Sequence, residues 1–280
     1  MTLISAARRL RHGQFRRLGP LWHVLGRMYR AALKWLPAGT AMQLIGPYGP
    51  FKFDSHFAFS DFEHWGGGHN NGFTATIEAC RNKRCVLDIG GHIGLVAMPA
   101  SQVVAAGGKV YAFEPGVANL RYLRRHLELN RIDNIEVMDA LVGEQDGDAV
   151  FYEQSGPTGQ NSVVVKKNHD LYTQTTRRQL TLDRFCDERG LAPDVMKVDV
   201  EGAEIMVLRG ARRMLAQCRP VIFLSVHPHE LTLLGSSTAE LSGLIDQLGY
   251  RCQEIDGSSV QSFRLAEYRL VPKEADTYAV

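Results

Sequence analysis

The sequence has few cysteines, and none of them is spaced as a metal-binding or redox pair. There are five, an odd number, and no two form a C-x-x-C pair. This argues against a disulfide framework and against a structural zinc site, so we expect a reducing compartment. The 280 residues contain no run of 18 apolar residues that could span a bilayer, and the N-terminus lacks the apolar stretch of a secretory signal. We therefore expect a cytoplasmic protein, with an ordinary globular composition of 45% hydrophobic and 22% charged residues.

Acidic residues are absent from the first 53 positions. That segment holds nine of the 32 lysines and arginines, which leaves 23 basic residues against 30 acidic ones from Asp54 onward. The sequence thus predicts a basic helical arm, residues 1–40, in front of a mildly acidic body. Between residues 21 and 36 the polar positions recur at steps of four and three, so they share one face of an amphipathic helix. They are His23, Arg27, Arg30 and Lys34.

Two interpretations of this arm are open. A basic amphipathic helix that carries tryptophans can lie on an anionic membrane, here the inner membrane surface. The helix can instead pack its apolar side on the body or on a second copy of the chain, giving a homodimer, and helices of this kind usually pack against protein. Nucleic-acid binding is the weakest option, since no recognisable binding module accompanies the charge.

From about residue 80 onward, short apolar runs alternate with amphipathic segments. This alternation predicts βαβ units and a doubly wound, mostly parallel α/β sheet. Residues 41–79, which include Gly-Pro-Tyr-Gly-Pro, indicate a loop-rich bridge to a main domain over 80–280. The expected strands are 85–89, 110–113, 135–138, 195–198, 221–226, 251–254 and 268–271, with a hairpin between 149–152 and 163–165.

In such a sheet, ligands bind at the carboxyl ends of the strands where the strand order reverses. The first loop of this kind is Asp88-Ile-Gly-Gly-His-Ile-Gly94, in which Gly90 and Gly94 permit a tight turn and a close approach to a ligand. A pyrophosphate-binding turn needs G-x-G-x-x-G, but the positions at that spacing after Gly90 are His92 and Leu95. The loop therefore favours a ligand with an amino acid end and no phosphates. It argues against a nucleotide-binding oxidoreductase.

The next two strand ends add polar groups. Glu114 ends the second strand, 24 residues after Gly90, where an acidic side chain can accept hydrogen bonds from ribose hydroxyls. Asp139 and Ala140 follow the third strand, and we expect them to hold an adenine; a surface aspartate without a ligand is the alternative. The predicted cofactor site is Asp88, Gly90, His92, Gly94, Glu114, Asp139 and Ala140.

At these positions the chain resembles the FkbM family of S-adenosylmethionine-dependent methyltransferases. The most specific stretch is Lys-Val-Asp-Val-Glu-Gly-Ala-Glu, residues 197–204, and the resemblance covers roughly 80–250. It implies the seven-stranded, Rossmann-like sheet of class I methyltransferases with an antiparallel last strand. It also implies S-adenosylmethionine as the cofactor and O-methylation of a sugar, glycan or secondary metabolite, with N-methylation of an amide or amine as the alternative. The other matching stretches are 86–94, 110–115, 130–143, 179–183, 207–210 and 221–227.

Three residues at the next strand ends are candidates for handling the acceptor. Asp199 and Glu201 follow the fourth strand, and His227 ends the fifth, which we expect to be its neighbour. A hydroxyl acceptor must lose its proton, and we predict that these residues take it directly. The alternative is that they hold a divalent cation; for magnesium they form a thin ligand shell. These acids also argue against a non-catalytic nucleotide-binding module.

Two neighbours of these residues qualify the interpretation. Glu204 lies in the first turn of the following helix, where an acid is good capping chemistry, so we expect no functional role for it. The family often has an acidic residue where this chain has Ser225. That departure leaves the role of the fifth strand's end open.

Membrane binding by the predicted basic arm can be tested directly with liposomes. We expect the full chain to co-sediment with anionic liposomes at low salt and to leave them at high salt. The reason is that attraction of about 1 kcal/mol per basic residue is screened by ions. A chain lacking residues 1–36 is the matched control and should stay in the supernatant. If the full chain also stays there while the truncation breaks a dimer, the helix packs on protein instead.

Overall fold

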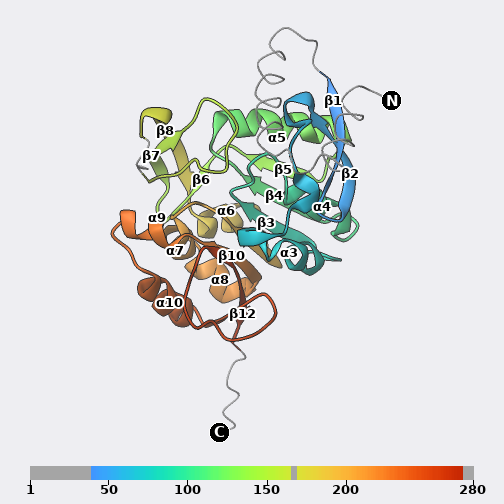
Figure 1. Cartoon of the computed structure of the whole chain (residues 1–280). Coiled ribbons are helices and arrows are strands. Elements are labelled where there is room, and N and C mark those ends of the chain that lie inside the picture. The colour runs from blue at the N-terminus through green and yellow to red at the C-terminus, as the bar shows by residue number, and fades with distance from the viewer. Residues whose placement is uncertain (1–38, 165–168, 274–280) are drawn as a thin grey trace. The chain divides into compact units, whose positions relative to one another are not determined.

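The computed structural model describes residues 39–164 and 169–273 (Figure 1). The predicted helix between residues 21 and 36 lies outside the described residues, so the predictions for the arm stay predictions. Contacts divide the chain into two compact units. One runs up to Trp65 and includes residues 128–131, and the other comprises 66–127 and the chain from residue 132 onward. Within the described ranges, no helix has the length and apolar character needed to cross a membrane.

The first unit contains a β-hairpin where the sequence predicts only a loop-rich bridge. Strands β1 (Thr40–Ile45) and β2 (Tyr48–Asp54) pair antiparallel, and every second residue of β1 is buried. Such alternation is typical of a half-buried strand, but over so few residues it is a weak sequence signal. The 3₁₀ turns η1 (Ser55–Phe57) and η2 (Phe62–His64) follow, and the ring of Phe62 lies 5.0 Å from that of Phe53.

The second unit is built on a seven-stranded sheet with the order β11-β12-β10-β9-β3-β4-β5. All neighbouring strands are parallel except for β12, which is antiparallel to both β10 and β11. The predicted class I methyltransferase sheet, doubly wound and mostly parallel, is thereby confirmed. The strands are β3 (Cys85–Ile89), β4 (Lys109–Phe113), β5 (Ile135–Met138), β9 (Val195–Val198), β10 (Val221–Val226), β11 (Tyr250–Gln253) and β12 (Ala266–Pro272).

Helices cover both faces of this sheet, which is why its central strands β3 and β9 are buried along their whole length (Figure 1). On one face, Leu87, Met196 and Leu224 join a single core with residues of five helices. On the other, α4 (Ala97–Val103) packs on β4 and β5, and α3 (Phe73–Ala79) packs on α4. The five helices of the first face are α6 (Leu182–Arg189), α7 (Glu204–Arg209), α8 (Arg212–Cys218), α9 (Pro228–Leu233) and α10 (Thr238–Gln247).

The chain leaves the sheet after β5 and returns at β9, so the strand order reverses between β3 and β9. The part of the chain between β5 and β9 forms a second sheet of β6 (Leu141–Val142), β7 (Gly147–Glu153) and β8 (Thr173–Leu180). The predicted partner of β7, residues 163–165, is wrong as a strand, because β7 pairs along its length with β8; next to the predicted residues, Ser162 forms a single antiparallel bridge with Tyr152. The sequence of β8, Thr-Gln-Thr-Thr-Arg-Arg-Gln-Leu, buries only its last two residues and so carries no apolar signal. The remaining elements are η3 (Gly68–Asn70), α5 (Val117–Asn130) and η4 (His169–Leu171).

Candidate active site

The predicted glycine loop leaves β3 at the point where the strand order reverses. Gly90 has a φ of 91°, and a Cβ atom there would lie 1.9 Å from the backbone carbonyl oxygen of Asp199. Only glycine fits this position, because any side chain would collide with the end of β9. The amides of Gly90 and Gly91 donate to the carbonyl of Phe113, at 3.0 and 2.8 Å. Gly94, with a φ of 97°, has the same backbone requirement. The loop is therefore fixed between the ends of β4 and β9.

Glu114 follows β4 and is buried beside this loop. Its carboxyl group accepts hydrogen bonds from the amide of His92 (2.8 Å), the amide of Gly116 (2.8 Å) and Nδ2 of Asn119 (3.2 Å). Burial raises the pKa of Glu114 to about 7, although these three donors favour the ionised form. A carboxylate offers roughly four lone-pair sites, so one remains, on Oε2. Glu114 can accept one ribose hydroxyl through it.

Asp88 and His92, at the start and in the middle of the glycine loop, each have one buried polar atom without a partner in the described part of the chain. Among the described residues, Oδ2 of Asp88 and Nε2 of His92 are buried without a hydrogen-bond partner. Burial raises the pKa of Asp88 to about 7, opposed by the charge of Lys197. Burial lowers the pKa of His92 to about 4, so its ring is neutral at physiological pH. Unpartnered buried polar atoms are costly, so these two suit a site that a polar ligand completes.

The two residues predicted to hold adenine lie at the end of β5. The side chain of Asp139 is 54% exposed and lies 3.7 Å from the guanidinium group of Arg124. Ala140 is buried, and its side chain belongs to the hydrophobic core. Only the backbone of Ala140 can therefore reach a ligand. The adenine role of both residues stays a prediction.

The structure brings Asp199, Glu201 and His227 together at adjacent strand ends. β9 and β10 pair in parallel, with Val198 opposite Leu224, so the residues that follow them share one edge of the sheet. Nε2 of His227 lies 3.6 Å from Oδ1 of Asp199 and 3.5 Å from Oε1 of Glu201. The roles predicted for these residues require this proximity.

The backbone holds Glu201 in an uncommon conformation. Its φ is 51°, in the left-handed region that residues other than glycine rarely adopt. The hydroxyl of Ser162, which is itself buried, donates to the carbonyl oxygen of Glu201 at 2.7 Å. Non-glycine residues in this region cost of order 1–3 kcal/mol and cluster at functional sites. The segment that carries Ser162 therefore helps to fix the position of Glu201.

Sequence reasoning missed the importance of Glu204. Its side chain is fully buried, and Oε1 lies 2.7 Å from Nδ1 of His227 and accepts from the amide of Gly202 at 3.1 Å. Burial disfavours a charged imidazole, but this hydrogen bond and the nearby carboxylates outweigh it and raise the pKa of His227 to about 9. In this arrangement the imidazole is protonated at neutral pH. That disfavours His227 as the proton acceptor and leaves the carboxylates.

Lys197, a buried lysine in the middle of β9, was also missed. Its Nζ lies 2.9 Å from Oε1 of Glu267 and 3.5 Å from Oδ2 of Asp199, and it donates to the hydroxyl of Ser225 at 2.7 Å. Burial opposes the charge of Lys197, but the two carboxylates prevail and raise its pKa. Glu267 is the cross-strand partner of Ser225 on β12. A carboxylate from the neighbouring strand therefore stands beside the position where the sequence shows serine.

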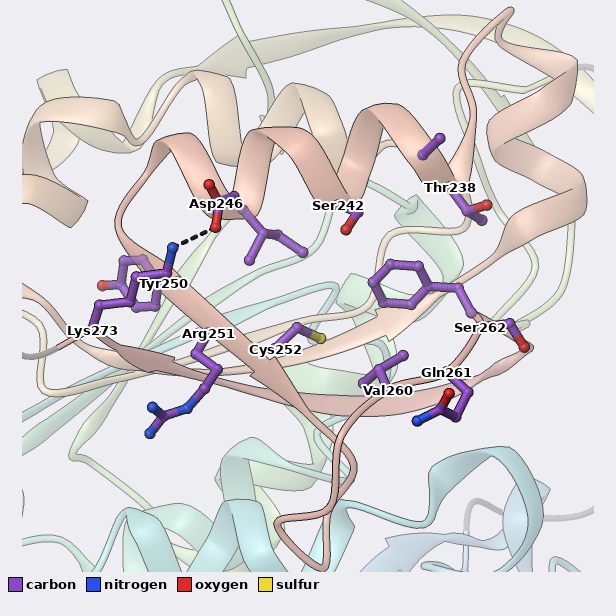
Figure 2. A pocket seen from close by; sticks show the side chains of 13 residues that line it. Thr238, Ser242, Asp246, Tyr250, Arg251, Cys252, Val260, Gln261, Ser262 and Lys273 are labelled. Carbon is purple, nitrogen blue, oxygen red and sulfur yellow. Dashed lines mark hydrogen bonds and ion pairs between the residues drawn. The ribbon is translucent and has the colours of Figure 1, made fainter.

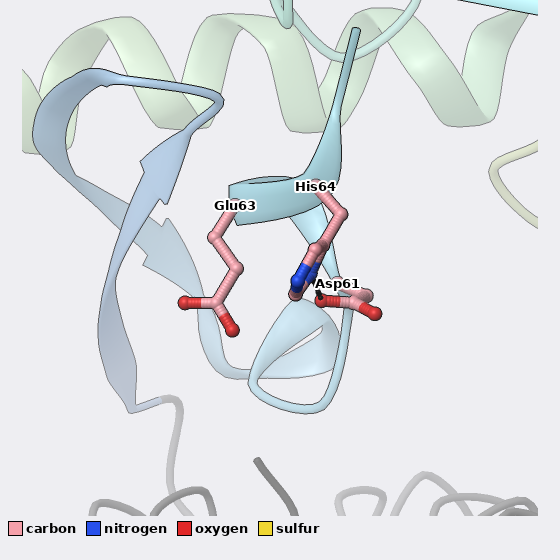
Figure 3. Close-up of side chains that lie close together, drawn as sticks. All are labelled: Asp61, Glu63 and His64. Carbon is pink, nitrogen blue, oxygen red and sulfur yellow. Dashed lines mark hydrogen bonds and ion pairs between the residues drawn. The ribbon is translucent and has the colours of Figure 1, made fainter. Parts of the chain in front are cut away.

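Two other features lie apart from these residues. A cavity of about 510 Å³ lies between α10 and β11, at the edge of the sheet, and none of the predicted site residues lines it (Figure 2). In the first unit, Asp61, Glu63 and His64 form a small group in which Asp61 and His64 are exposed, with the Asp61 carboxylate 2.6 Å from Nδ1 of His64 (Figure 3). Neither was predicted from the sequence.

Comparison with known proteins gives an independent view of the chain. Residues 88–252 match the protein family described as the methyltransferase FkbM domain. A curated relative, Methyltransferase 1 of Beauveria bassiana (strain ARSEF 2860), is 28% identical over 145 residues, which cover 45% of this chain and 57% of the relative. The chain thus spans just over half the length of this relative.

Two solved structures each resemble about two thirds of the chain. The methyltransferase FkbM of Methylobacillus flagellatus KT has a TM-score of 0.45 and 20% identity, over 68% of this chain and 44% of that one. Aeropyrum pernix fibrillarin in complex with natively bound S-adenosylmethionine has a TM-score of 0.38 and 18% identity, over 69% of this chain and 67% of that one.

The buried network generates a stability prediction. Lys197→Met should lower the free energy of unfolding by about 3–5 kcal/mol, because it leaves the buried Glu267 without its cation. Combining it with Glu267→Leu should recover at least half of this loss, since the uncompensated charge is then removed. Urea unfolding of both variants measures these values. Lys273→Met, which breaks an exposed pair with Asp246, is the matched control and should cost less than about 1 kcal/mol. A loss that small in Lys197→Met would contradict the buried ion pair.

Proposed function

Since this chain belongs to the FkbM family of methyltransferases, we propose that it transfers a methyl group from S-adenosylmethionine to a hydroxyl oxygen. The acceptor we propose is a sugar, a glycan or a secondary metabolite. The observation that carries the proposal is the contact between the glycine loop and the acid cluster. Gly90 lies directly against the backbone of Asp199, so a cofactor on the loop has the carboxylates as neighbours.

The cofactor side fits S-adenosylmethionine in its chemistry. The loop has glycine where the backbone must turn, and it lacks the glycine pattern of a pyrophosphate site. Glu114 retains one acceptor site for a ribose hydroxyl. The methionine end then belongs beside Gly90 and Gly94, and the adenine toward Asp139 and the backbone of Ala140. S-adenosylmethionine supplies the electrophilic methyl group.

The acceptor side supports oxygen over nitrogen. Methyl transfer from a sulfonium is an in-line displacement, and orientation of the acceptor supplies much of the rate acceleration. A hydroxyl must also lose its proton, and Asp199 and Glu201 are positioned to receive it near the cofactor loop. The charges of Lys197 and His227 outweigh the partial desolvation of Asp199 and lower its pKa, which keeps this carboxylate ionised. A neutral amine acceptor attacks through its free lone pair and needs no base before the transfer.

The state of Glu114 predicts how cofactor binding depends on pH. The ionised carboxylate accepts a ribose hydroxyl better than the neutral acid, and its pKa without ligand is about 7. The affinity for S-adenosylhomocysteine should therefore rise roughly tenfold between pH 6 and pH 8, as the ionised fraction rises. Titration calorimetry across this range measures it. Glu114→Gln should bind about 1.5–3 kcal/mol more weakly at pH 8 and lose most of the pH dependence. An unchanged slope in that variant would contradict the ribose assignment.

Loss of the acid at position 201 tests the acceptor side. Glu201→Gln should bind S-adenosylhomocysteine with wild-type affinity and lose roughly 10²–10⁴-fold in turnover, because the amide cannot accept the proton of the acceptor hydroxyl. Glu240→Gln, which changes an exposed acid on α10, is the control and should keep full turnover. Full turnover in Glu201→Gln would sink the O-methylation mechanism and favour a nitrogen acceptor.

A further inference from the structure

The acid cluster has the composition and spacing of a cation site. We propose that Asp199, Glu201 and His227 bind a first-row divalent cation such as Mn²⁺ or Zn²⁺, and that the acceptor hydroxyl binds to the same ion. The role of the ion rests on the proposed methyl transfer, whereas the presence of the site does not. One ligand atom from each residue lies within 4.8 Å of the other two.

The distances between the ligand atoms fit a shared ion. Two atoms that each lie about 2.1 Å from one cation are about 3.0 Å apart at a right angle and about 3.4 Å apart at the tetrahedral angle. The imidazole nitrogen of His227 lies 3.5 Å from the Glu201 oxygen and 3.6 Å from the Asp199 oxygen. Both nitrogen–oxygen distances are thus close to those around a shared ion, and the two carboxylate oxygens lie within 4.8 Å of each other.

Glu204 prepares His227 as a ligand. A carboxylate only accepts hydrogen bonds, so Nδ1 of His227 must carry the proton in its 2.7 Å contact with Glu204. The other nitrogen, Nε2, is the atom that faces Asp199 and Glu201. Metal-bound histidines almost always donate their second N–H to a group such as a carboxylate, which fixes the ring and its tautomer.

The charges of the network favour a divalent ion. Asp199, Glu201, Glu204 and Glu267 bring four carboxylates together. Once Nε2 of His227 gives up its proton to bind an ion, the cation that these contacts set against them is Lys197. Lys197 lies near Oδ2 of Asp199, whereas Oδ1 is the oxygen nearest to the imidazole. Asp199 can thus keep its lysine while the other oxygen binds an ion.

The three proposed ligands, one imidazole and two carboxylates, indicate which ion and which kind of acceptor would bind. Calcium and magnesium prefer oxygen ligands alone, whereas one imidazole with two carboxylates suits manganese, iron or zinc. Three protein ligands leave open positions on a four- to six-coordinate ion. One takes the acceptor hydroxyl, and a second can take an adjacent oxygen of the same molecule. The site would therefore favour a hydroxyl flanked by a second oxygen, as in a vicinal diol of a sugar.

The cation would supply the acidity that the reaction needs. It lowers the pKa of the bound hydroxyl, as it does for bound water. The proton passes to the second carboxylate oxygen of Glu201. An electron pair on the acceptor oxygen then forms the bond to the methyl carbon, and the carbon–sulfur bond breaks with its electron pair left on sulfur. The products are the methyl ether and S-adenosylhomocysteine.

Binding of Mn²⁺ to the full chain tests this inference without any acceptor. Calorimetry and the electron paramagnetic resonance signal of free Mn²⁺ should show one site in the wild type. Asp199→Asn and His227→Ala should each weaken it at least 100-fold, and Glu204→Gln should weaken it roughly 10–100-fold, the effect of losing a partner that orients a ligand. Asp61→Asn, in the other Asp/Glu/His group, is the control and should leave this site unchanged. Circular dichroism verifies that each variant is folded.

The outcomes separate this inference from the proposed function. Absence of Mn²⁺ and Zn²⁺ binding in the wild type, or binding unchanged in both Asp199→Asn and His227→Ala, overturns the cation site. If turnover then persists in EDTA and is lost in Glu201→Gln, methyl transfer with a direct carboxylate base stands. If the cation binds as expected but S-adenosylhomocysteine does not, the site exists and the proposed function fails.

Discussion

Charge compensation at the carboxyl ends of β9 and β10 is the constraint on which the rest of the site depends. Lys197 and His227 approach Asp199 from two neighbouring strands, and Glu267 and Glu204 stand behind them. A buried carboxylate is tolerated only when it is paired and hydrogen-bonded, so each member needs the others. The network fixes the position of the end of β9, and Gly90 of the glycine loop lies directly against the backbone of that end. On the proposed function, the position of the cofactor and the chemistry of the acceptor therefore both depend on Asp199.

The segment between β7 and β8 ties the two halves of the site together. Asn119, which donates to Glu114, also exchanges hydrogen bonds with the backbone of Thr158. A few residues later, Ser162 holds the carbonyl of Glu201. One connection thus contacts Asn119, a hydrogen-bond donor to Glu114, at one end and the backbone of Glu201 at the other. On the proposed function, this connection can influence which acceptor reacts, because connecting segments often carry binding residues.

The sequence predicts those parts of the fold that local chemistry determines. The predicted bounds of β3, β5, β9 and β10 match the observed residues, because each strand is a short, mostly apolar run between polar segments. The loop at Gly90 and the acid Glu114 were found for the same reason, since they end such runs. The strand β8 could not be predicted, because its polar residues pair with β7 only in the folded sheet.

The residues that orient the site were hidden for a different reason. Glu204 occupies the first turn of a helix, where an acid needs no further explanation, and only the fold brings it to His227. Glu267 is 42 positions from Ser225 in the chain and becomes its partner through the antiparallel register of β12. The lysine in the apolar run of β9 was the one available signal, since a buried lysine almost always has an acidic partner.

A crystal structure of the full chain with S-adenosylhomocysteine would test the central claim most directly. We expect the ligand on the Gly90–Gly94 loop, with a ribose hydroxyl on Oε2 of Glu114 and the sulfur facing Asp199 and Glu201. The observation of the ligand elsewhere, such as in the cavity between α10 and β11, would contradict it. So would a ribose that does not contact Glu114, or a sulfur that faces away from the two acids.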